Sequence, residues 1–333
     1  MFRACTIDIM LRWLVIGIGD ITRKRVLPAI LAEPRSRLAG IVTRDPAKAE
    51  AYAAPAWSDL DRALAESGAD AVYVATPVFL HARQTIACLR AGRHVLCEKP
   101  MALNHAEARS MQAAAEESGR LLGIAYYRRM YPKVGRAREL IEAGAIGRPF
   151  VAEATNHWWP SLESPSDWRA DPARAGAGPL FDIASHRIDL MNYLFGAPVR
   201  ASGHISTLVR AIPVEDNATV IVEYGSGMRG VVDVRWHSRV ERDEFRIRGT
   251  EGELDLTPLN GPRLVHPGGE ERIPAHENLH YPCVADFVSA ALEGRPPRSS
   301  GATALLTEWV TNEVLNKETE VRSRKSEANP RQC

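Results

Sequence analysis

Five short apolar segments, separated by longer stretches of helical character, fill the first third of the chain. They predict strands at Leu11–Gly17, Leu38–Thr43, Ala71–Ala75, His94–Cys97 and Leu121–Ala125. Strands that alternate with helices are typical of βαβ units, whose crossover connections make neighbouring strands parallel. We therefore predict an α/β Rossmann domain at residues 11–125, built on a doubly wound parallel sheet.

The pattern changes after residue 125. A helix is expected around 133–143, a strand near 150–158, a polar loop at 160–179 and a second helix at 180–194. Segments of alternating polarity follow at 201–209, 218–224, 228–236, 244–249 and 253–257, separated by glycine-containing turns. This alternation favours antiparallel strands with one solvated face. We predict an α+β domain at residues 126–316 with a large, mostly antiparallel open sheet, closed by helices at 281–293 and 303–316.

Length and charge limit the classes of function. A chain of 333 residues exceeds the size at which one core usually stops growing, so two domains are expected. Its 42 basic and 41 acidic residues give a net charge of +1, which disfavours nucleic acid as a partner. No apolar run approaches the roughly 20 residues that span a bilayer, so no membrane partner is expected.

Five scattered cysteines fit a reducing compartment, the cytoplasm. Residues 1–10 and 317–333 are expected to be flexible extensions.

The turn after the first strand reads Gly17-Ile18-Gly19-Asp20-Ile21-Thr22. Two glycines between a strand and a helix let the backbone approach a pyrophosphate at the helix N-terminus. Gly17, Gly19, Asp20 and Ile21 are therefore candidate cofactor-binding residues. Thr22 stands where the dinucleotide fingerprint has glycine or alanine, and an ordinary tight turn is the alternative. The strand before it and the helix after it favour dinucleotide binding.

Thr43-Arg44-Asp45 follows the second strand, where an acidic residue would bind the ribose hydroxyls of NAD. A guanidinium at Arg44 can pair with a 2′-phosphate, and Thr43 can add a hydroxyl donor. The pair therefore favours NADP. NAD stays possible, because Asp45 can play the acidic role or cap the next helix ahead of Pro46.

Two further strands end in polar turns at the same carboxyl edge. Ala75-Thr76-Pro77 follows one, with His81 a helical turn beyond, and Glu98-Lys99-Pro100 follows the other. Ligands of open α/β sheets bind at this edge, so these residues are expected to flank the cofactor. A lysine beside a nicotinamide would be partly desolvated and able to exchange protons near neutral pH. The alternatives are a structural histidine and a surface lysine paired with Glu98.

A glycine-rich segment in the second half leads into a helix that carries Asp182 and His186 at i and i+4. Residues at this spacing share one helix face, so the carboxylate can orient the imidazole as a general acid or base. A metal site with Asp189 is the alternative, but no further histidine or cysteine cluster completes a ligand set, so no metal is predicted.

Aromatic and basic side chains that suit a polyhydroxylated ring lie after the fifth strand and around the long loop. The candidate substrate-binding residues are Tyr127, Arg128, Trp168, Arg169 and His186. Some of these large aromatics are expected to be packing groups instead.

The order of these motifs, a dinucleotide turn, Ala-Thr-Pro, Glu-Lys-Pro and then Asp-x-x-x-His, resembles the glucose-fructose oxidoreductase, inositol dehydrogenase and rhizopine catabolism family (Gfo/Idh/MocA) from Leu11 to about Asn316. The resemblance implies that Lys99, Asp182 and His186 are the catalytic residues and that Glu98 and Pro100 shape the cofactor site. It also implies an open sheet that often mediates homo-oligomerisation. Thr22, and Val78 in place of an asparagine common in the family, depart from its pattern.

The resulting expectation is an NAD(P)-dependent oxidoreductase that moves a hydride between the nicotinamide and the carbinol or keto carbon of a small sugar, cyclitol or related polyol. In the expected mechanism His186, oriented by Asp182, removes the hydroxyl proton while Lys99 stabilises the alkoxide; these roles of Lys99 and His186 are interchangeable at this point. Two alternatives stay open. One is a catalytically silent NAD(P)-sensing regulator, and the other is an NADP-dependent reductase or dehydrogenase of a non-sugar ring such as a dihydrodiol or tetrapyrrole.

Overall fold

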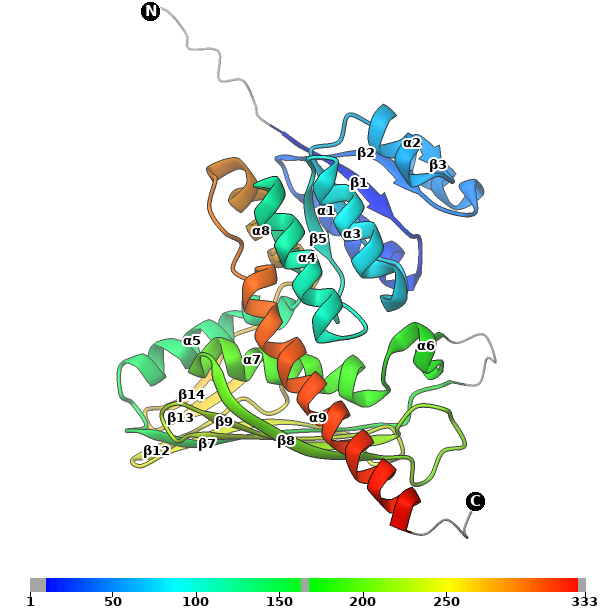
Figure 1. Cartoon of the computed structure of the whole chain (residues 1–333). Helices are drawn as coiled ribbons and strands as arrows, with labels where there is room; N and C mark the ends of the chain where they lie inside the picture. The colour runs from blue at the N-terminus through cyan, green and yellow to red at the C-terminus, as the bar shows by residue number, and fades with distance from the viewer. Residues whose placement is uncertain (1–9, 163–167, 329–333) are drawn as a thin grey trace, which may run out of the picture. The chain divides into compact units, whose positions relative to one another are not determined.

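A computed structural model describes residues 10–162 and 168–328 (Figure 1). Within this part of the chain the protein forms two compact units. The first contains the chain up to Met101 together with Arg109–Tyr127 and His276–Gly301, and the second contains Ala102–Ala108, Arg128–Ala275 and the chain from Ala302 onward. The sequence placed a boundary near residue 125, but it gave no sign that His276–Gly301 returns to the first unit. No helix among the described residues is long and apolar enough to cross a membrane.

The first unit is built on a six-stranded sheet with the order β3-β2-β1-β4-β5-β6, in which every neighbouring pair is parallel. Its strands are β1 (Leu11–Ile16), β2 (Ser36–Val42), β3 (Ala56–Trp57), β4 (Ala71–Val74), β5 (His94–Cys97) and β6 (Leu122–Ile124). The strand order reverses at β1, and such a switch point is where open α/β sheets bind ligands. The predicted doubly wound sheet is confirmed, and the two-residue β3 is an addition.

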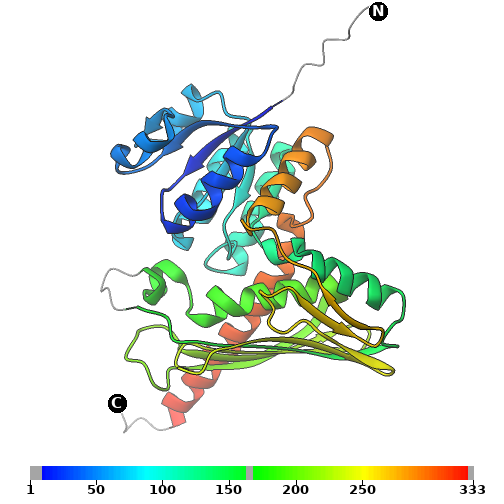
Figure 2. The same cartoon turned by 180° about the vertical axis from the view of Figure 1, so that it is seen from behind.

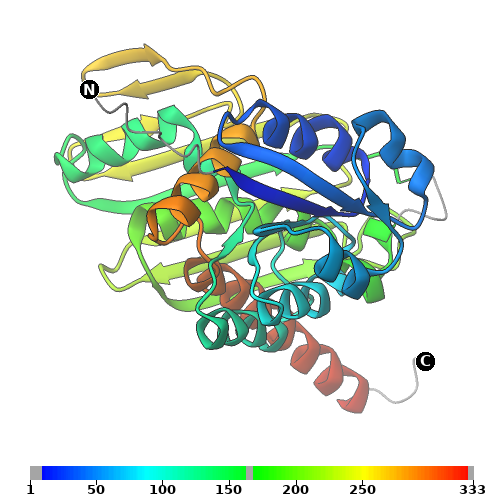
Figure 3. The same ribbon diagram turned by 90° about the horizontal axis from the view of Figure 1, so that it is seen from above.

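Helices cover both faces of this sheet. They are η1 (Thr22–Val26), α1 (Leu27–Ala32), η2 (Pro46–Tyr52), α2 (Leu60–Glu66), η3 (Val78–Leu80), α3 (His81–Arg90), α4 (His105–Ser118) and α8 (Tyr281–Glu293). Figure 3 shows α1 and α8 on one face, and α3 and α4 on the other. The N-terminus of α4 is capped by Asn104, whose side-chain oxygen accepts the Glu107 N–H at 2.9 Å.

The core of the first unit explains why the chain returns to it. Trp13, on the central strand β1, is fully buried. Its ring centroid lies 6.3 Å from that of Tyr73 and 5.5 Å from that of Phe287 on α8. The Ile124 N–H also donates to the carbonyl of Ser299 at 2.9 Å. Large aromatic side chains dominate core energetics, so the first unit is complete only with a helix encoded near the end of the chain.

The second unit is built on an eight-stranded sheet with the order β14-β13-β12-β11-β7-β10-β9-β8. The strands are β7 (Pro149–His157), β8 (Pro198–Ser206), β9 (Asn217–Tyr224), β10 (Arg229–Arg235), β11 (Arg242–Gly249), β12 (Gly252–Asp255), β13 (Arg263–His266) and β14 (Gly269–Arg272). Only β7 and β10 pair in parallel among the described strands of this sheet. The predicted mostly antiparallel sheet is confirmed.

The helices of the second unit are η4 (Tyr127–Met130) and α9 (Gly301–Ala328), whose first residues still belong to the first unit, together with α5 (Pro132–Glu142), η5 (Trp168–Ala170), α6 (Pro172–Ala175), η6 (Leu180–Ala184) and α7 (Ser185–Phe195). Figures 1 and 2 show α5 and α7 on one face of the sheet. The buried side chains of β10, including Val232 and Val234, alternate with half-buried Val231 and Asp233. The opposite face of β7, β10, β11 and β12 is covered by no described helix, as expected for an open sheet.

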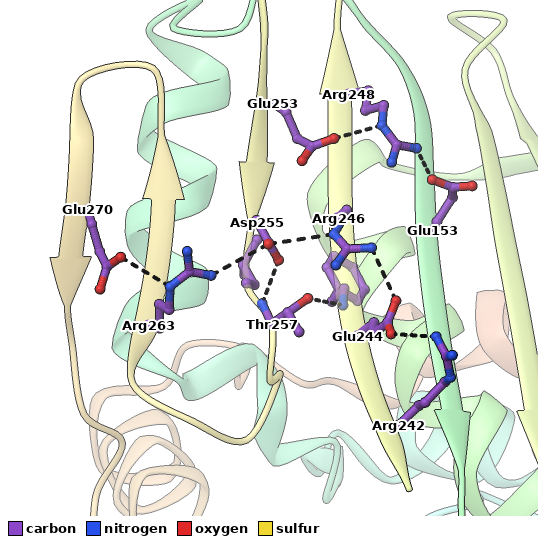
Figure 4. A network of polar contacts seen from close by, with 12 residues as sticks. Glu153, Arg242, Glu244, Arg246, Arg248, Glu253, Asp255, Thr257, Arg263 and Glu270 are labelled. Carbon is purple, nitrogen blue, oxygen red and sulfur yellow. Dashed lines mark hydrogen bonds and ion pairs between the residues drawn. The ribbon is translucent and has the colours of Figure 1, made fainter. Parts of the chain in front are cut away.

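Charged side chains fill much of this open face (Figure 4). Arg246, on β11, lies 3.5 Å from Asp255 and 3.1 Å from Glu244. Arg263 continues the series, 3.5 Å from Asp255 and 3.1 Å from Glu270. Because these groups are partly exposed to solvent, which screens their charges, the individual pairs contribute little to stability. What they define is a surface on which positive and negative charges alternate.

The structure differs from the sequence prediction mainly at three places. The strand expected at 201–209 ends at Ser206, and the short polar strands β13 and β14 were not predicted at all. The last helix, expected to end at Asn316, continues to Ala328. The residues beyond Asn316 include several Lys, Glu and Arg, which have a high intrinsic helix propensity. Residues 1–9 and 329–333 of the expected extensions lie outside the described part of the chain.

Candidate active site

Gly17 ends β1 at a point where the fold itself requires glycine. Its φ is +92°, and a Cβ there would lie 2.7 Å from the Ala75 carbonyl oxygen. The second value is shorter than any ordinary contact, and the first is a conformation that L side chains rarely adopt. Gly17 therefore lets the ends of β1 and β4 come close together at the switch point.

Gly19 is different, because nothing in the folded chain requires it. A Cβ at Gly19 would meet no atom within 4 Å. The space beside the start of the first helix is therefore open, as the close approach of a pyrophosphate to backbone N–H groups requires. Next to it, Asp20 is exposed and paired with Arg23 and Lys24, and Ile21 is 40% exposed. The residues present fit a dinucleotide.

Thr22 replaces the small third residue of the fingerprint and is completely buried. Among the described residues its hydroxyl oxygen has no hydrogen-bond partner. The helix begins with a π-helical turn at Thr22–Val26. Single π-turns of this kind are frequent at functional sites, and here the turn coincides with the departure from the fingerprint.

The turn after β2 presents Arg44 to solvent. Thr43 is buried, and its hydroxyl accepts the Asp45 N–H at 3.2 Å, so its side chain shapes the turn. Within residues 10–162 and 168–328 no acidic side chain pairs with Arg44. Asp45 lies 3.8 Å from Lys48 and makes no side-chain cap to the helix that follows, so the capping alternative is wrong.

His81 holds two turns of the carboxyl edge together. It is 1% exposed, and its ring nitrogens lie 2.8 Å from the Thr76 carbonyl oxygen and 2.9 Å from that of Pro100. Burial lowers the pKa of His81, which favours the neutral imidazole, so its single N–H donates to one of these two carbonyls while the ring packs against the other. The Thr76 hydroxyl donates to Gln84 at 2.7 Å. The turn after β4, which contains Ala75, Thr76 and Pro77, is thereby tied to the turn after β5.

Glu98, at the end of β5, is a buried carboxylate with defined donors. Its Oε1 accepts the Tyr73 hydroxyl at 2.8 Å and lies 3.2 Å from His280 Nε2, and its Oε2 accepts the Lys99 N–H at 3.3 Å. Burial opposes ionisation of Glu98, but the hydrogen bond from His280 and its charge, together with the Tyr73 hydroxyl and the Lys99 charge, outweigh burial and hold the pKa below its usual value. Glu98 therefore fixes the backbone from which the half-buried Lys99 side chain extends.

His280 was missed by the sequence analysis. It lies in the segment that returns to the first unit, directly before α8, and it is 3% exposed. Its ring centroid is 4.6 Å from that of Tyr127, a candidate substrate-binding residue. Only its sequence position beside a helix start could have drawn attention to it, because its contact with Glu98 spans most of the chain.

Asp182 and His186 belong to one continuous helix of the second unit. Asp182 lies in the π-helical turn η6, and His186 lies in the first turn of α7, where it is 4% exposed. Side chains four residues apart remain on the same side of such a helix, as the spacing predicted. The sequence therefore located the helix and its two candidate groups.

Two interactions of the second unit were not anticipated. Glu215, before β9, accepts the N–H groups of Gly178 at 2.8 Å and Leu180 at 3.0 Å, at the start of the helix that carries Asp182. Asp189, the third group of the metal alternative, binds Arg129 with both oxygens, and both side chains are buried. Among the described residues no group of three potential ligands could hold a metal ion.

The remaining candidate substrate-binding residues occupy the second unit. Arg128 is 8% exposed, and its guanidinium lies 3.4 Å from the Asn260 side-chain oxygen. Trp168 is half-buried in η5, and the Arg169 guanidinium donates to the Ser161 carbonyl at 3.2 Å. Part of the long polar loop, residues 163–167, lies outside the described residues.

Comparison with known proteins gives two family matches that follow the two halves of the chain. The family described as "Oxidoreductase family, NAD-binding Rossmann fold" matches residues 11–126, and the family described as "GFO/IDH/MocA C-terminal domain" matches residues 134–255. The 1,5-anhydro-D-fructose reductase of Ensifer adhaerens is 30% identical over 309 residues, which are 88% of this chain and 91% of that protein.

Two further relatives are similar over most of their length. The D-xylose 1-dehydrogenase (NADP(+)) 2 of Haloferax volcanii is 30% identical over 73% of this chain and 75% of that protein. The crystal structure of the aldose-aldose oxidoreductase from Caulobacter crescentus, complexed with glycerol, has a TM-score of 0.85 and 27% identity, covering 93% of this chain and 98% of that chain.

Proposed function

Since the chain belongs to the GFO/IDH/MocA oxidoreductase family, we propose that it transfers a hydride between a nicotinamide cofactor and the carbinol or keto carbon of a small sugar, cyclitol or related polyol. The observation that carries this proposal is the turn after β1. Gly17 is required by the fold, whereas Gly19 is not, and the open space beside Gly19 fits a bound pyrophosphate. Relatives that reduce or oxidise sugars favour neither a silent regulator nor a non-sugar ring.

The cofactor site that we propose follows the carboxyl edge of the first unit's sheet. Its members are Gly17, Gly19, Asp20, Ile21, Thr43, Arg44, Ala75, Thr76, Pro77, His81, Glu98 and Lys99. When bound, the nicotinamide ring supplies or accepts the hydride. His81 acts there through the two turns that it joins, and Glu98 acts through the Lys99 backbone.

The chemistry that we propose for the chain's own residues concerns one proton. His186, oriented by Asp182, takes the hydroxyl proton of the alcohol, and the Lys99 ammonium stabilises the oxygen as its charge develops. The opposite assignment, in which Lys99 is the base and His186 stabilises the oxygen, is tested by the same variants. Tyr127, Arg128, Trp168 and Arg169 are proposed to contact the polyhydroxylated substrate.

NADP is the preferred cofactor in this proposal. Arg44 is exposed and carries no acidic partner among the described residues, whereas Asp45, the alternative ligand of the ribose hydroxyls, lies close to Lys48. A free guanidinium favours a 2′-phosphate. The test is nicotinamide fluorescence during separate titrations with NADPH and NADH. Arg44→Ala should weaken NADPH binding about 10-fold or more and leave NADH unchanged, while Asp45→Asn serves as the neighbouring control. Equal loss for both cofactors would contradict the assignment.

The reaction is tested with 1,5-anhydro-D-fructose and NADPH, and with D-xylose or myo-inositol and NADP⁺, by nicotinamide absorbance. Lys99→Ala and His186→Ala should each reduce turnover about 100-fold or more. The control is His266→Ala, because His266 lies on β13 and pairs with Glu271. If both site variants kept wild-type turnover, the assignment of Lys99 and His186 would be wrong.

We further propose that the cytoplasmic protein is a homo-oligomer joined through the open face of the second unit's sheet. The supporting observations are a face without covering helices, alternating charges (Figure 4) and an exposed Ile221 beside Val231. The cytoplasmic location that we propose is supported by the three described cysteines, which are free and buried and so suit a reducing compartment. Light scattering after gel filtration tests the oligomer: Ile221→Asp should yield monomers, and Leu208→Asp, at an exposed loop position outside the sheet, should not. Monomeric wild type would refute it.

A further inference from the structure

The helix that carries Asp182 and His186 begins at a buried carboxylate from another part of the chain. Glu215 is 8% exposed, and its two oxygens accept the N–H groups of Gly178 at 2.8 Å and Leu180 at 3.0 Å. The first N–H groups of a helix have no partner within the helix, and they attract negative charge. Glu215 satisfies two of them from outside the helix.

Gly178 is shaped to this contact. A Cβ at Gly178 would lie 2.2 Å from the Glu215 carbonyl oxygen, so any other residue would push the two segments apart. The Gly178 carbonyl in turn accepts the N–H of Phe181 at 3.1 Å and of Asp182 at 3.0 Å. The segment before β9 and the first helical turn are therefore fitted together at backbone distance.

The residues that follow Glu215 make its position rigid. Asp216 is fully buried and accepts the N–H groups of Leu208, Val209 and Arg210 at 2.8 to 3.0 Å. Asn217, the first residue of β9, donates to the Ser206 carbonyl at 2.8 Å. We call Glu215, Asp216 and Asn217 the clasp. It connects the helix start to the sheet through hydrogen bonds rather than through side-chain packing.

We propose that Glu215 is a positioning residue that sets the place of Asp182 and His186 along and about their helix axis. This inference rests on the proposed function, because it assumes that those two residues act on the substrate. Glu215 belongs to no candidate set derived from the sequence, and it acts through the N–H groups of Gly178 and Leu180 rather than on the reacting atoms.

Removing this carboxylate would disturb the start of the helix. Two buried N–H groups would lose their acceptor, and an unsatisfied buried donor forces the backbone to move or to admit water. Asp182 lies only two residues beyond Leu180, so any such movement reaches it first. Displacements of about 1 Å in a catalytic group can cost about 100-fold in rate. A glutamine keeps one acceptor oxygen but places an NH₂ group against the second N–H.

The experiment compares Glu215→Gln and Glu215→Ala with a matched control, Glu33→Gln. Glu33 is also a buried glutamate (3% exposed) that accepts a backbone N–H, from Arg35 at 2.7 Å, but it lies at the end of α1 in the first unit. Amide hydrogen exchange of the peptide covering 178–186 is measured for each variant. The affinity for NADPH is then measured, and kcat and KM are determined with whichever substrate the wild type turns over.

We expect faster exchange of this peptide in both Glu215 variants and no change there in Glu33→Gln. We also expect kcat to fall about 10-fold for Glu215→Gln and about 100-fold for Glu215→Ala, with NADPH affinity and KM retained. Unchanged exchange would overturn the proposal, and so would faster exchange with wild-type kcat. Full turnover by His186→Ala would instead refute the proposed function, and hydrogen exchange would still test the clasp without any substrate.

Discussion

The perturbation that tests the structural reasoning most quantitatively is Asp216→Asn. Asp216 is fully buried, and burial opposes its ionisation, but the N–H of Arg210, the Asn217 side chain and the N–H groups of Leu208 and Val209 outweigh this effect. They lower the pKa of Asp216 from 3.8 to about 2. Because one pKa unit corresponds to about 1.4 kcal/mol, the ionised carboxylate contributes about 2 kcal/mol to the free energy of unfolding.

The sign of the pH dependence follows from the direction of the shift. The pKa of Asp216 is lower in the folded than in the unfolded chain, so its stabilisation is fully present above pH 3.8 and is lost as the pH falls to about 2. Urea unfolding of wild type and Asp216→Asn, followed by tryptophan fluorescence, should differ by about 2 kcal/mol near neutral pH. The difference should shrink steadily below the unfolded value.

Asp59→Asn is the control, because Asp59 accepts one backbone N–H, that of Arg62 at 2.7 Å, at an exposed helix start. Its loss should cost about 1 kcal/mol or less. A difference between wild type and Asp216→Asn that stayed constant from neutral pH to about pH 2 would refute the reasoning, since the charge would then not be what the three N–H groups stabilise.

Three further predictions concern folding and cofactor binding. Gly19→Ala should keep wild-type stability but lose NADPH affinity about 10-fold or more, whereas Gly17→Ala should lower both, as thermal unfolding and fluorescence titration would show. Arg129→Met should cost about 3 to 5 kcal/mol in urea unfolding, because it leaves the buried carboxylate of Asp189 without its partner. Lys133→Met should cost roughly 2 to 4 kcal/mol in the same assay, because it removes the donor of two backbone carbonyl groups, each 2.7 Å from its ammonium nitrogen. Equal behaviour of the two glycine variants, or wild-type midpoints for the other two, would contradict these expectations.

The sequence predicted the elements whose pattern is local. The buried strand β4 is a continuous apolar run, β1 is apolar except for the exposed Arg12, and β5 and α8 begin and end at the residues expected. It also predicted the helix of Asp182 and His186, because an i and i+4 spacing is visible without any tertiary contact. What these elements share is that a short window contains the whole signal.

The elements that could not be predicted depend on contacts between distant parts of the chain. Nothing around His280 indicates that it meets Glu98, and the strands β13 and β14 lack the apolar alternation by which strands are found. Glu215 did leave a signal, because Glu215, Asp216 and Asn217 are three consecutive polar residues where a strand begins. Their side-chain oxygens could have been predicted to accept hydrogen bonds from backbone N–H groups. The sequence does not indicate which helix supplies those N–H groups.

The central claim, hydride transfer to a substrate carbon that depends on His186 and Lys99, is tested most directly by isotope transfer. The protein is incubated with 1,5-anhydro-D-fructose and NADPH deuterated at C4 of the nicotinamide ring, and the product is examined by mass spectrometry. We expect one deuterium on the new carbinol carbon, with its rate of appearance strongly reduced in Lys99→Ala and His186→Ala. The claim would be contradicted if NADPH labelled on either face of the nicotinamide ring gave a product without deuterium. It would also be contradicted if Lys99→Ala and His186→Ala formed the product as fast as the wild type.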